Sequence, residues 1–185
     1  METVETKTIG KYRIDIFPDD SPWNPREDSN LGTMVCFHRR YSLGDKHDYN
    51  FQNYDGWDDM KKNIIKDNNV GIILPLYLYD HSGITMNTTG FSCNWDSGQV
   101  GFVFISKDKI REEYSCKRIS KKLIERVTKY LVSEVETYDS YIKGECYGYR
   151  ITDTEKDVEV ESCWGYYDEK YCMSEAECLV KNITE

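Results

Sequence analysis

The chain has 185 residues, of which 39% are hydrophobic, 31% are charged and 14% are aromatic, and its formal net charge is −9. This composition argues against disorder, and the length predicts a single globular domain over residues 1–185. The negative charge disfavours non-specific attraction to nucleic acid or to an anionic membrane, and it favours contact with basic protein surfaces.

Seven cysteines, an odd number, are scattered through the chain without a CxxC spacing. This pattern predicts reduced thiols rather than a disulfide framework. The N-terminal segment METVETKTIGKYR lacks the apolar region of a secretion signal, and no run approaches the ~18 apolar residues of a membrane span. We therefore expect a cytoplasmic protein with no membrane partner.

The first third of the chain is predicted to contain two strands and one helix. Tyr12 to Phe17 alternates apolar and charged residues, which predicts a half-buried strand. A long loop rich in Pro, Asp and Ser follows it, and Thr33 to Phe37 forms the second predicted strand. Trp57 to Ile65 carries apolar residues at helical spacing, with Asp55 as the expected N-cap.

The middle of the chain is predicted to be a sheet. Val70 to Tyr79 is almost wholly apolar, which indicates a central strand covered on both faces. Pro75 within it cannot donate a hydrogen bond, so we expect a bulge, an edge or a change of pairing partner there. Gly83 to Thr89 and Gln99 to Ile105 are further predicted strands, and together these segments predict an antiparallel meander.

Two helices are expected next. Ser106 is a suitable N-cap for a short helix. Apolar residues then recur every three or four positions over about 118–141, which predicts a long amphipathic helix ending near Gly144. Its first half is basic and its second half acidic. These charges have the unfavourable sign for the helix dipole at both ends, at a cost in helix stability of ~0.3–1 kcal/mol per well-placed charge. A solvated face explains this pattern, and the alternative is direct nucleic-acid binding through the basic residues Lys117, Arg118, Lys121 and Lys122.

The C-terminal part is predicted to be a hairpin followed by a short helix capped by Ser174. In the second strand of the hairpin we expect Val158, Val160 and Trp164 to be buried on one face. The whole pattern predicts an α+β fold, in which one long amphipathic helix packs on a mostly antiparallel sheet of about five to seven strands, together with shorter helices.

A cluster of polar residues between two predicted strands suggests one possible site. His38 and His81 each follow a predicted strand, so adjacent strands could bring them together. A small hydrolase or metal-dependent enzyme centred on His81, Cys93 and Asp80 is therefore one hypothesis. No HExxH, CxxC, GxSxG or glycine-rich phosphate motif occurs, so we predict no cofactor and no metal, and the role of His47 stays open.

The negative charge is concentrated near the C-terminus. From Ile151 to Glu185 there are ten acidic residues and three lysines, a net charge of −7. The alternation of Asp157, Glu159 and Glu161 predicts carboxylates on one strand face at intervals of ~6.7 Å. Such a row could occupy a basic nucleic-acid channel in a partner, although strand faces are often charged for solubility alone.

Part of the chain resembles a known group of proteins. The segments LYLYDHSGITMNTTGFSCNWDSGQVGFVFISKDKIREEY and KRISKKLIERVTKYLVSEVETYDSYIKGECYGYRI, with VESCWGYY, resemble a family of small uncharacterised proteins of bacteriophages and mobile elements. The resemblance covers roughly residues 33–167, and YDHSG and WDSGQVG are its most specific blocks. It implies a phage-type accessory protein in the bacterial host cytoplasm and, by analogy, an anti-CRISPR or other anti-defence inhibitor.

These observations favour a binding protein over an enzyme. It would inhibit a bacterial nucleic-acid-handling defence system by docking an acidic, aromatic surface on a basic host protein. The expected partner-binding residues are Asp157, Glu159, Glu161, Trp95, Asp96, Tyr166 and Tyr167. The hydrolase stays the alternative, and the sequence does not set the oligomeric state.

Overall fold

The computed structural model describes residues 2–93 and 95–184, which form two compact units. Unit 1 consists of the chain up to Asn24 and from Ser140 onward, and unit 2 is Pro25–Asp139. Unit 2 is therefore an insertion between two segments of unit 1. The expectation of a single domain stays a prediction, because compactness does not say whether either unit folds alone.

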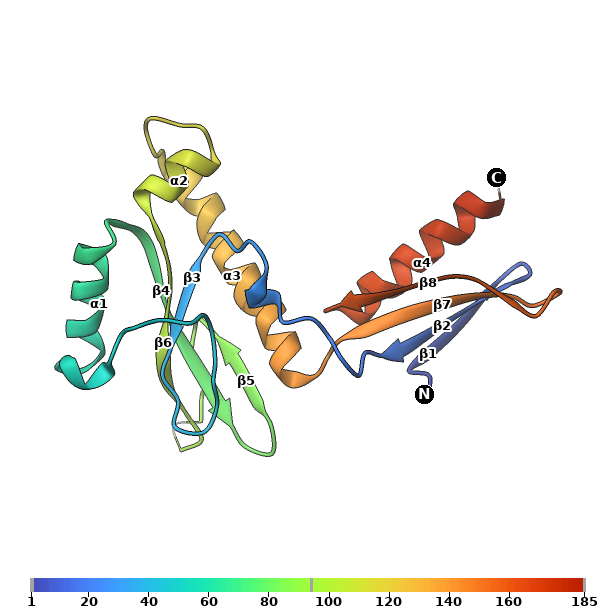
Figure 1. Cartoon of the computed structure of the whole chain (residues 1–185), viewed down its shortest axis with the longest axis horizontal. Coiled ribbons are helices and arrows are strands. Elements are labelled where there is room, and N and C mark those ends of the chain that lie inside the picture. Colours follow the sequence, from blue (N-terminus) through green and yellow to red (C-terminus); the bar gives the residue numbers. More distant parts are fainter. Residues whose placement is uncertain (1, 94, 185) are drawn as a thin grey trace. The chain divides into compact units, whose positions relative to one another are not determined.

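Unit 1 is a four-stranded antiparallel sheet with one helix on one face (Figure 1). The strand order is β1-β2-β7-β8. The strands are β1 (Glu5–Ile9), β2 (Tyr12–Pro18), β7 (Tyr147–Asp153) and β8 (Val158–Tyr166), and the helix is α4 (Glu169–Thr184).

Alternation along β2 and β7 builds the core of this unit. Ile14 and Ile16 of β2 are fully buried, as is Ile151 of β7, and all three side chains pack against α4. The helix contributes four buried side chains to the same cluster, Cys172, Met173, Ala176 and Val180. Burial raises the pKa of the Cys172 thiol to about 12, so this cysteine acts as a small neutral core residue.

The last helix begins earlier than the sequence indicated. α4 starts at Glu169, and the carboxylate of Asp168 accepts the backbone N–H of Tyr171 at 2.6 Å. Asp168 therefore satisfies one of the free N–H groups of the first turn, and the expectation that Ser174 caps this helix is wrong.

Unit 2 contains a second four-stranded antiparallel sheet, with strand order β3-β6-β4-β5. The strands are β3 (Thr33–Cys36), β4 (Val70–Asp80), β5 (Ile84–Asn87) and β6 (Ser97–Ser106). The helices are α1 (Gly56–Asp67), α2 (Lys107–Glu113) and α3 (Lys121–Lys143), with single 3-10 turns at η1 (Pro25–Glu27) and η2 (Phe51–Asn53). The predicted meander is wrong, because after the β4–β5 hairpin the chain returns to insert β6 between β3 and β4.

Helices α1 and α3 cover opposite faces of this sheet (Figure 1). Phe102 and Phe104 of β6 pack with Met60 and Ile64 of α1. The neighbouring Val103 points the other way, toward the face that α3 covers, so β6 is buried on both sides. The predicted α+β class and the long helix on a sheet are therefore confirmed, with the strands divided between two sheets.

Two local predictions in unit 2 are refined. β4 gains its second neighbour, β5, only from Tyr77 onward, so the expected change of pairing lies just after Pro75. The predicted cap of α1 is at the right position, but the Asp55 side chain makes no capping bond. Instead the backbone N–H of Asp55 donates to the carboxylate of Asp59 at 3.1 Å.

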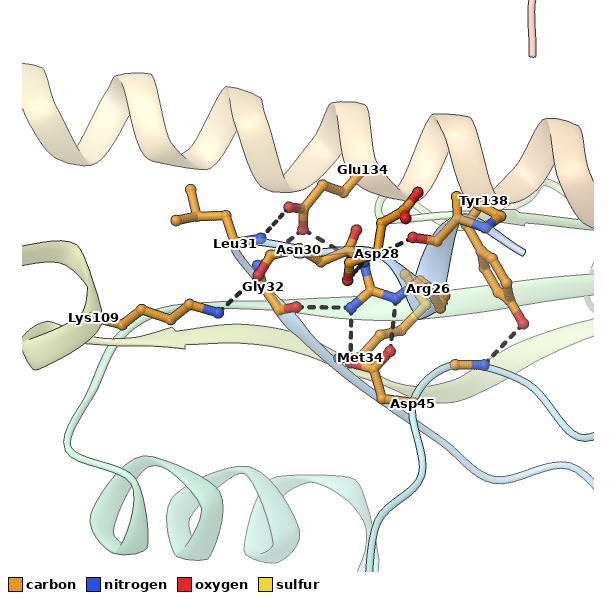
Figure 2. A network of polar contacts seen from close by, with 12 residues as sticks. Arg26, Asp28, Asn30, Leu31, Gly32, Met34, Asp45, Lys109, Glu134 and Tyr138 are labelled. Atoms are coloured by element: carbon orange, nitrogen blue, oxygen red, sulfur yellow. Dashed lines mark hydrogen bonds and ion pairs between the residues drawn. The ribbon is translucent and has the colours of Figure 1, made fainter. Parts of the chain in front are cut away.

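A buried arginine connects the loops of unit 2 to its longest helix (Figure 2). The side chain of Arg26 is only 2% exposed, and its Nε and Nη2 donate to the two carboxylate oxygens of Asp45 at 2.8 and 2.7 Å. Nη2 also donates to the carbonyl of Gly32 at 2.7 Å, and Glu134 of α3 lies 3.7 Å from Nη1. Glu134 in turn accepts the N–H of Gly32 at 2.9 Å. One guanidinium thus joins η1, the start of β3, the Asp45 loop and α3.

The contact between β3 and β6 provides a test of this packing. A Cβ atom added at Gly101 of β6 would lie 1.9 Å from the carbonyl oxygen of Val35. We expect Gly101→Ala to lower the free energy of unfolding by about 1–3 kcal/mol, measured by urea denaturation, because the two strands must move apart. Gly98→Ala is the matched control on the same strand, where nothing lies within 4 Å of the added carbon. Equal losses in the two variants would contradict the crowding.

Candidate binding surfaces

The topology of unit 2 brings three chain segments together at one end of its sheet, where the strands begin or finish. β3 and β4 both run antiparallel to β6, so their C-terminal ends meet the N-terminal end of β6. The segment after Cys36, the end of β4 at Asp80 and the turn at Asp96 are therefore neighbours. This explains why polar residues far apart in the sequence gather in one place.

Asp80 is the centre of the first cluster at this end of the sheet. Its carboxylate accepts hydrogen bonds from the guanidinium of Arg40 and, at 3.5 Å, from the hydroxyl of Tyr41. The Nε2 atom of His38 lies 3.8 Å from the same carboxylate, and the imidazole stacks on the Tyr41 ring at 4.9 Å. Burial lowers the pKa of His38, while the negative charge of Asp80 partly opposes that shift. The imidazole is therefore neutral at pH 7.

His81 and Cys93 meet a different carboxylate. His81 Nδ1 lies 3.4 Å from Asp96, and the Cys93 sulfur lies 3.8 Å from the same oxygen of Asp96. Nucleophilic catalysis needs the base beside the thiol, whereas here the imidazole and the thiol both contact the same carboxylate oxygen. The backbone N–H of Asp80 donates to the carbonyl of Asp96 at 2.8 Å, while the Asp80 carboxylate belongs to the first cluster. The geometry therefore gives the hydrolase hypothesis no support.

Two open grooves adjoin this end of the sheet. One, of about 790 Å³, is lined by the loop from Cys36 to His47, and the other, of about 360 Å³, extends past Asp80 to Val100. Trp95 lines the smaller groove and is 96% exposed. Within the part of the chain that the structure describes, no group of three or more His, Cys, Asp or Glu side chains is placed to hold a metal ion.

His47 and Cys36 have structural contacts beneath the larger groove. The Nε2 atom of His47 lies 3.0 Å from the carbonyl oxygen of Cys36, and its ring centre is 4.9 Å from that of Phe37. Burial raises the pKa of the Cys36 thiol to about 12, so this cysteine is a neutral thiol at physiological pH. Both residues therefore support the loop.

Unit 1 carries almost all of the net charge. It contains 16 acidic and 8 basic residues, a net charge of −8, whereas unit 2 contains 17 acidic and 16 basic residues, a net charge of −1. Of this charge, −7 lies in the segment from Ile151 to Glu185, so the C-terminal segment accounts for nearly all of the net charge of unit 1.

The three carboxylates predicted to form a row lie in different places. Asp157 has φ = 55° in the turn before β8 and is not part of the strand. In β8, Glu161 is paired with Ile151 and Glu159 with Thr152, and a bulge separates the two pairs. Because cross-strand partners share a face, the bulge places Glu161 on the face of α4 and Glu159 on the opposite face. The prediction of one row on one face is therefore wrong.

The sheet face opposite α4 carries an aromatic and charged group. The Trp164 ring centre lies 6.2 Å from that of Phe17, and the guanidinium of Arg150 lies 5.3 Å from the Phe17 ring. Arg150 also pairs with Glu159 at 2.9 Å, and Glu159 accepts the hydroxyl of Ser162 at 2.8 Å. Glu159 is therefore held in place by two side chains.

The outer strand β8 is exposed along its length. Val158, Val160 and Trp164 are 49%, 39% and 37% exposed. The prediction that these three side chains bury one face is wrong, because β8 is the last strand of the sheet and α4 packs mainly over β2 and β7.

The two tyrosines predicted as anchors are half-buried. The Tyr166 ring packs against Tyr149 and Tyr171, with ring centres 5.8 and 5.9 Å apart, and burial raises the pKa of its hydroxyl. The hydroxyl of Tyr167 donates to the backbone carbonyl of Trp23. Trp164, which the sequence placed in the core, is the more accessible aromatic residue of this strand.

The basic residues singled out in the sequence lie around the start of α3. Lys117 and Arg118 are in the loop before the helix, and Lys121 and Lys122 are in its first turn. All four are exposed.

Comparisons with known proteins add no relatives: no family model, curated protein or solved structure matches the chain. The resemblance to phage proteins therefore stays a prediction. Among the described residues, no helix is both long enough and apolar enough to cross a membrane.

The Asp80 cluster gives a prediction about pH. In Asp80→Asn we expect the pKa of His38 to fall further, because the negative charge that favours the imidazolium is gone. An NMR titration of the imidazole resonances measures this shift. In the native chain, the pKa of folded His38 already lies below the unfolded value of 6.5, so the unfolded state takes up the proton more readily. The free energy of unfolding of the native chain should therefore fall as the pH drops below 6.5.

The control is Asp96→Asn, which removes a carboxylate from the same end of the sheet but leaves the pair of His38 and Asp80 in place. An unchanged His38 pKa in Asp80→Asn, or an equal shift in both variants, would contradict the assignment.

Proposed function

We propose that this chain is a binding protein that takes up a basic, extended segment of a partner protein along the outer edge of β8. The observation that carries this proposal is that β8 (Val158–Tyr166) is the exposed edge strand of a unit with a net charge of −8. A free strand edge offers backbone N–H and C=O groups to another strand, and side chains on both faces select the sequence that pairs with it.

Charge determines which segment fits. Glu159 and Glu161 lie on opposite faces of β8, so an added strand with Lys or Arg on either face meets a carboxylate. The same glutamates and the bulge between them disfavour pairing with a second copy of β8, because like charges would lie opposite each other. The exposed side chains of Val158 and Val160 offer apolar contacts beside the charges.

The partner we propose is a nucleic-acid-handling protein of a bacterial host, which the chain would inhibit in the manner of an anti-CRISPR protein. Proteins that bind nucleic acid expose basic segments for the phosphate backbone, and an acidic edge strand competes for those segments. The resemblance of the YDHSG and WDSGQVG blocks to phage proteins supports this setting. Trp95 and Asp96 belong to unit 2, whereas β8 belongs to unit 1, so the proposal does not use these two residues.

The strand-addition mode is tested with a synthetic peptide of alternating lysine and valine. We expect this peptide to shift the backbone amide resonances of β8 in NMR spectra, because the unpaired edge groups become hydrogen-bonded. A second peptide of equal charge, with prolines replacing the valines, should not bind, because proline cannot donate to a ladder. Equal binding of both peptides would show charge attraction without strand addition and would overturn the mode.

The role of the glutamates is tested by charge reversal. Glu159→Lys combined with Glu161→Lys should weaken peptide binding at least about tenfold, because attraction becomes repulsion at the docking edge. Glu2→Lys combined with Glu5→Lys is the matched control, since it makes the same change of charge, with Glu5 on the other edge strand, β1. Equal weakening in both double variants would contradict docking at β8.

The same variants test the proposed setting. From a bacterial lysate, the native chain should retain a nucleic-acid-handling protein that the Glu159/Glu161 double variant no longer retains. Retention of the same protein by both chains would contradict binding of that protein through β8.

A further inference from the structure

A groove of about 390 Å³ lies beside α2 in unit 2. Its lining consists of Gly71, Lys107, Arg111, Lys117, Arg118, Ile119 and Ile124. Four of these seven residues are cationic and none is acidic. In a chain with a net charge of −9, this is a marked local reversal of sign.

We propose that this groove binds the phosphate backbone of single-stranded nucleic acid. The proposal concerns a different surface from β8 and does not depend on the docking of a protein segment there.

The surroundings of the groove are basic as well. Residues 107–122 contain seven Lys or Arg residues and three acidic residues, a net charge of +4. Salt screens charges that lie more than ~10 Å apart at 0.1 M ionic strength, so the potential at the groove depends mainly on the charges next to it. The overall negative charge therefore does not exclude local attraction of a polyanion.

The cations of the groove are available to a ligand. Lys107, Lys117 and Arg118 make no side-chain ion pair within the part of the chain that the structure describes. Arg111 pairs with Asp108 at 2.7 Å, and both side chains are exposed, so water screens that pair. Phosphate oxygens can replace water around all four groups.

The start of α3 adds to the positive potential. The hydroxyl of Ser120 accepts the N–H of Leu123 at 3.2 Å, and Lys121 and Lys122 occupy the first helical turn. These lysines oppose the positive end of the helix dipole, and a bound phosphate would relieve that repulsion. A unit that is strained by its own charges in this way gains stability when an anion binds.

The apolar parts of the surface favour a single strand over a duplex. Ile119 and Ile124 line the groove, and Ile124 is 40% exposed, so an unpaired base finds an apolar wall beside the cations. Further along α3, the exposed Tyr130 ring lies 5.9 Å from the guanidinium of Arg126. Bases stack on such groups only when they are unpaired. A duplex would present phosphates on a rigid rod and hide its bases from these contacts.

Fluorescence anisotropy with a labelled oligothymidylate of roughly 20 nucleotides tests the proposal. We expect saturable binding that weakens about fifty-fold between about 50 and about 200 mM salt, as four neutralised phosphates on a single strand predict. A duplex of the same length should bind more weakly than the single strand. No binding at low salt, or equal affinity for the duplex, would overturn the proposal.

Charge reversal locates the site. Lys117→Glu combined with Arg118→Glu should weaken oligothymidylate binding more than about tenfold, because two cations of the groove become anions. Lys61→Glu combined with Lys62→Glu on α1 is the matched control, with the same change of net charge outside the groove. Circular dichroism checks that both variants are folded. Equal weakening, or equal affinity of the native chain for inorganic polyphosphate, would overturn nucleic-acid recognition by this groove.

Discussion

The guanidinium of Arg26 holds unit 2 together at its most irregular part. It is buried among Asp45, Glu134 and the carbonyl of Gly32, and it therefore fixes two loops and the middle of α3 relative to β3. Removing one member of such a network leaves a buried charge unpaired, which costs far more than the net stability of the intact network suggests. The loop that carries His38 to Tyr41 returns to the sheet at Asp45, so the geometry around Asp80 depends on this arginine as well.

A single extra residue in β8 has a comparable effect on unit 1. The bulge between Glu159 and Glu161 resets the alternation of side chains and distributes the carboxylates over both faces of the strand. An acidic strip confined to one face would suit a flat basic surface, whereas an edge strand with charge on both faces suits an extended segment. A bulge in an edge strand also disfavours pairing between identical chains, so this local irregularity protects the exposed edge of the sheet against aggregation.

Much of the fold follows from local patterns. The long helix, the cap at Ser106 and the hairpin of β7 and β8 are visible in the sequence, because periodicity and turn residues act over a few positions. β1 was missed because Glu5–Ile9 has almost no apolar face. The place of β6 between β3 and β4, and the pairing of Arg26 with residues 19 and 108 positions away, depend on tertiary contacts that no local pattern carries. At the candidate site, the sequence found the right polar segment but paired His81 with the wrong aspartate.

The insertion of unit 2 also determines when unit 1 can form. The central ladder of its sheet joins β2 to β7, whose paired residues are 129 to 141 positions apart. During synthesis, the hairpin of β1 and β2 therefore emerges with Ile14 and Ile16 uncovered, long before β7 and α4 exist to bury them. Loop closure over such a length adds only a slowly growing entropic cost once the intervening unit is compact. The topology therefore sets one order: the sheet of unit 1 is completed only after the whole of unit 2 has been synthesised.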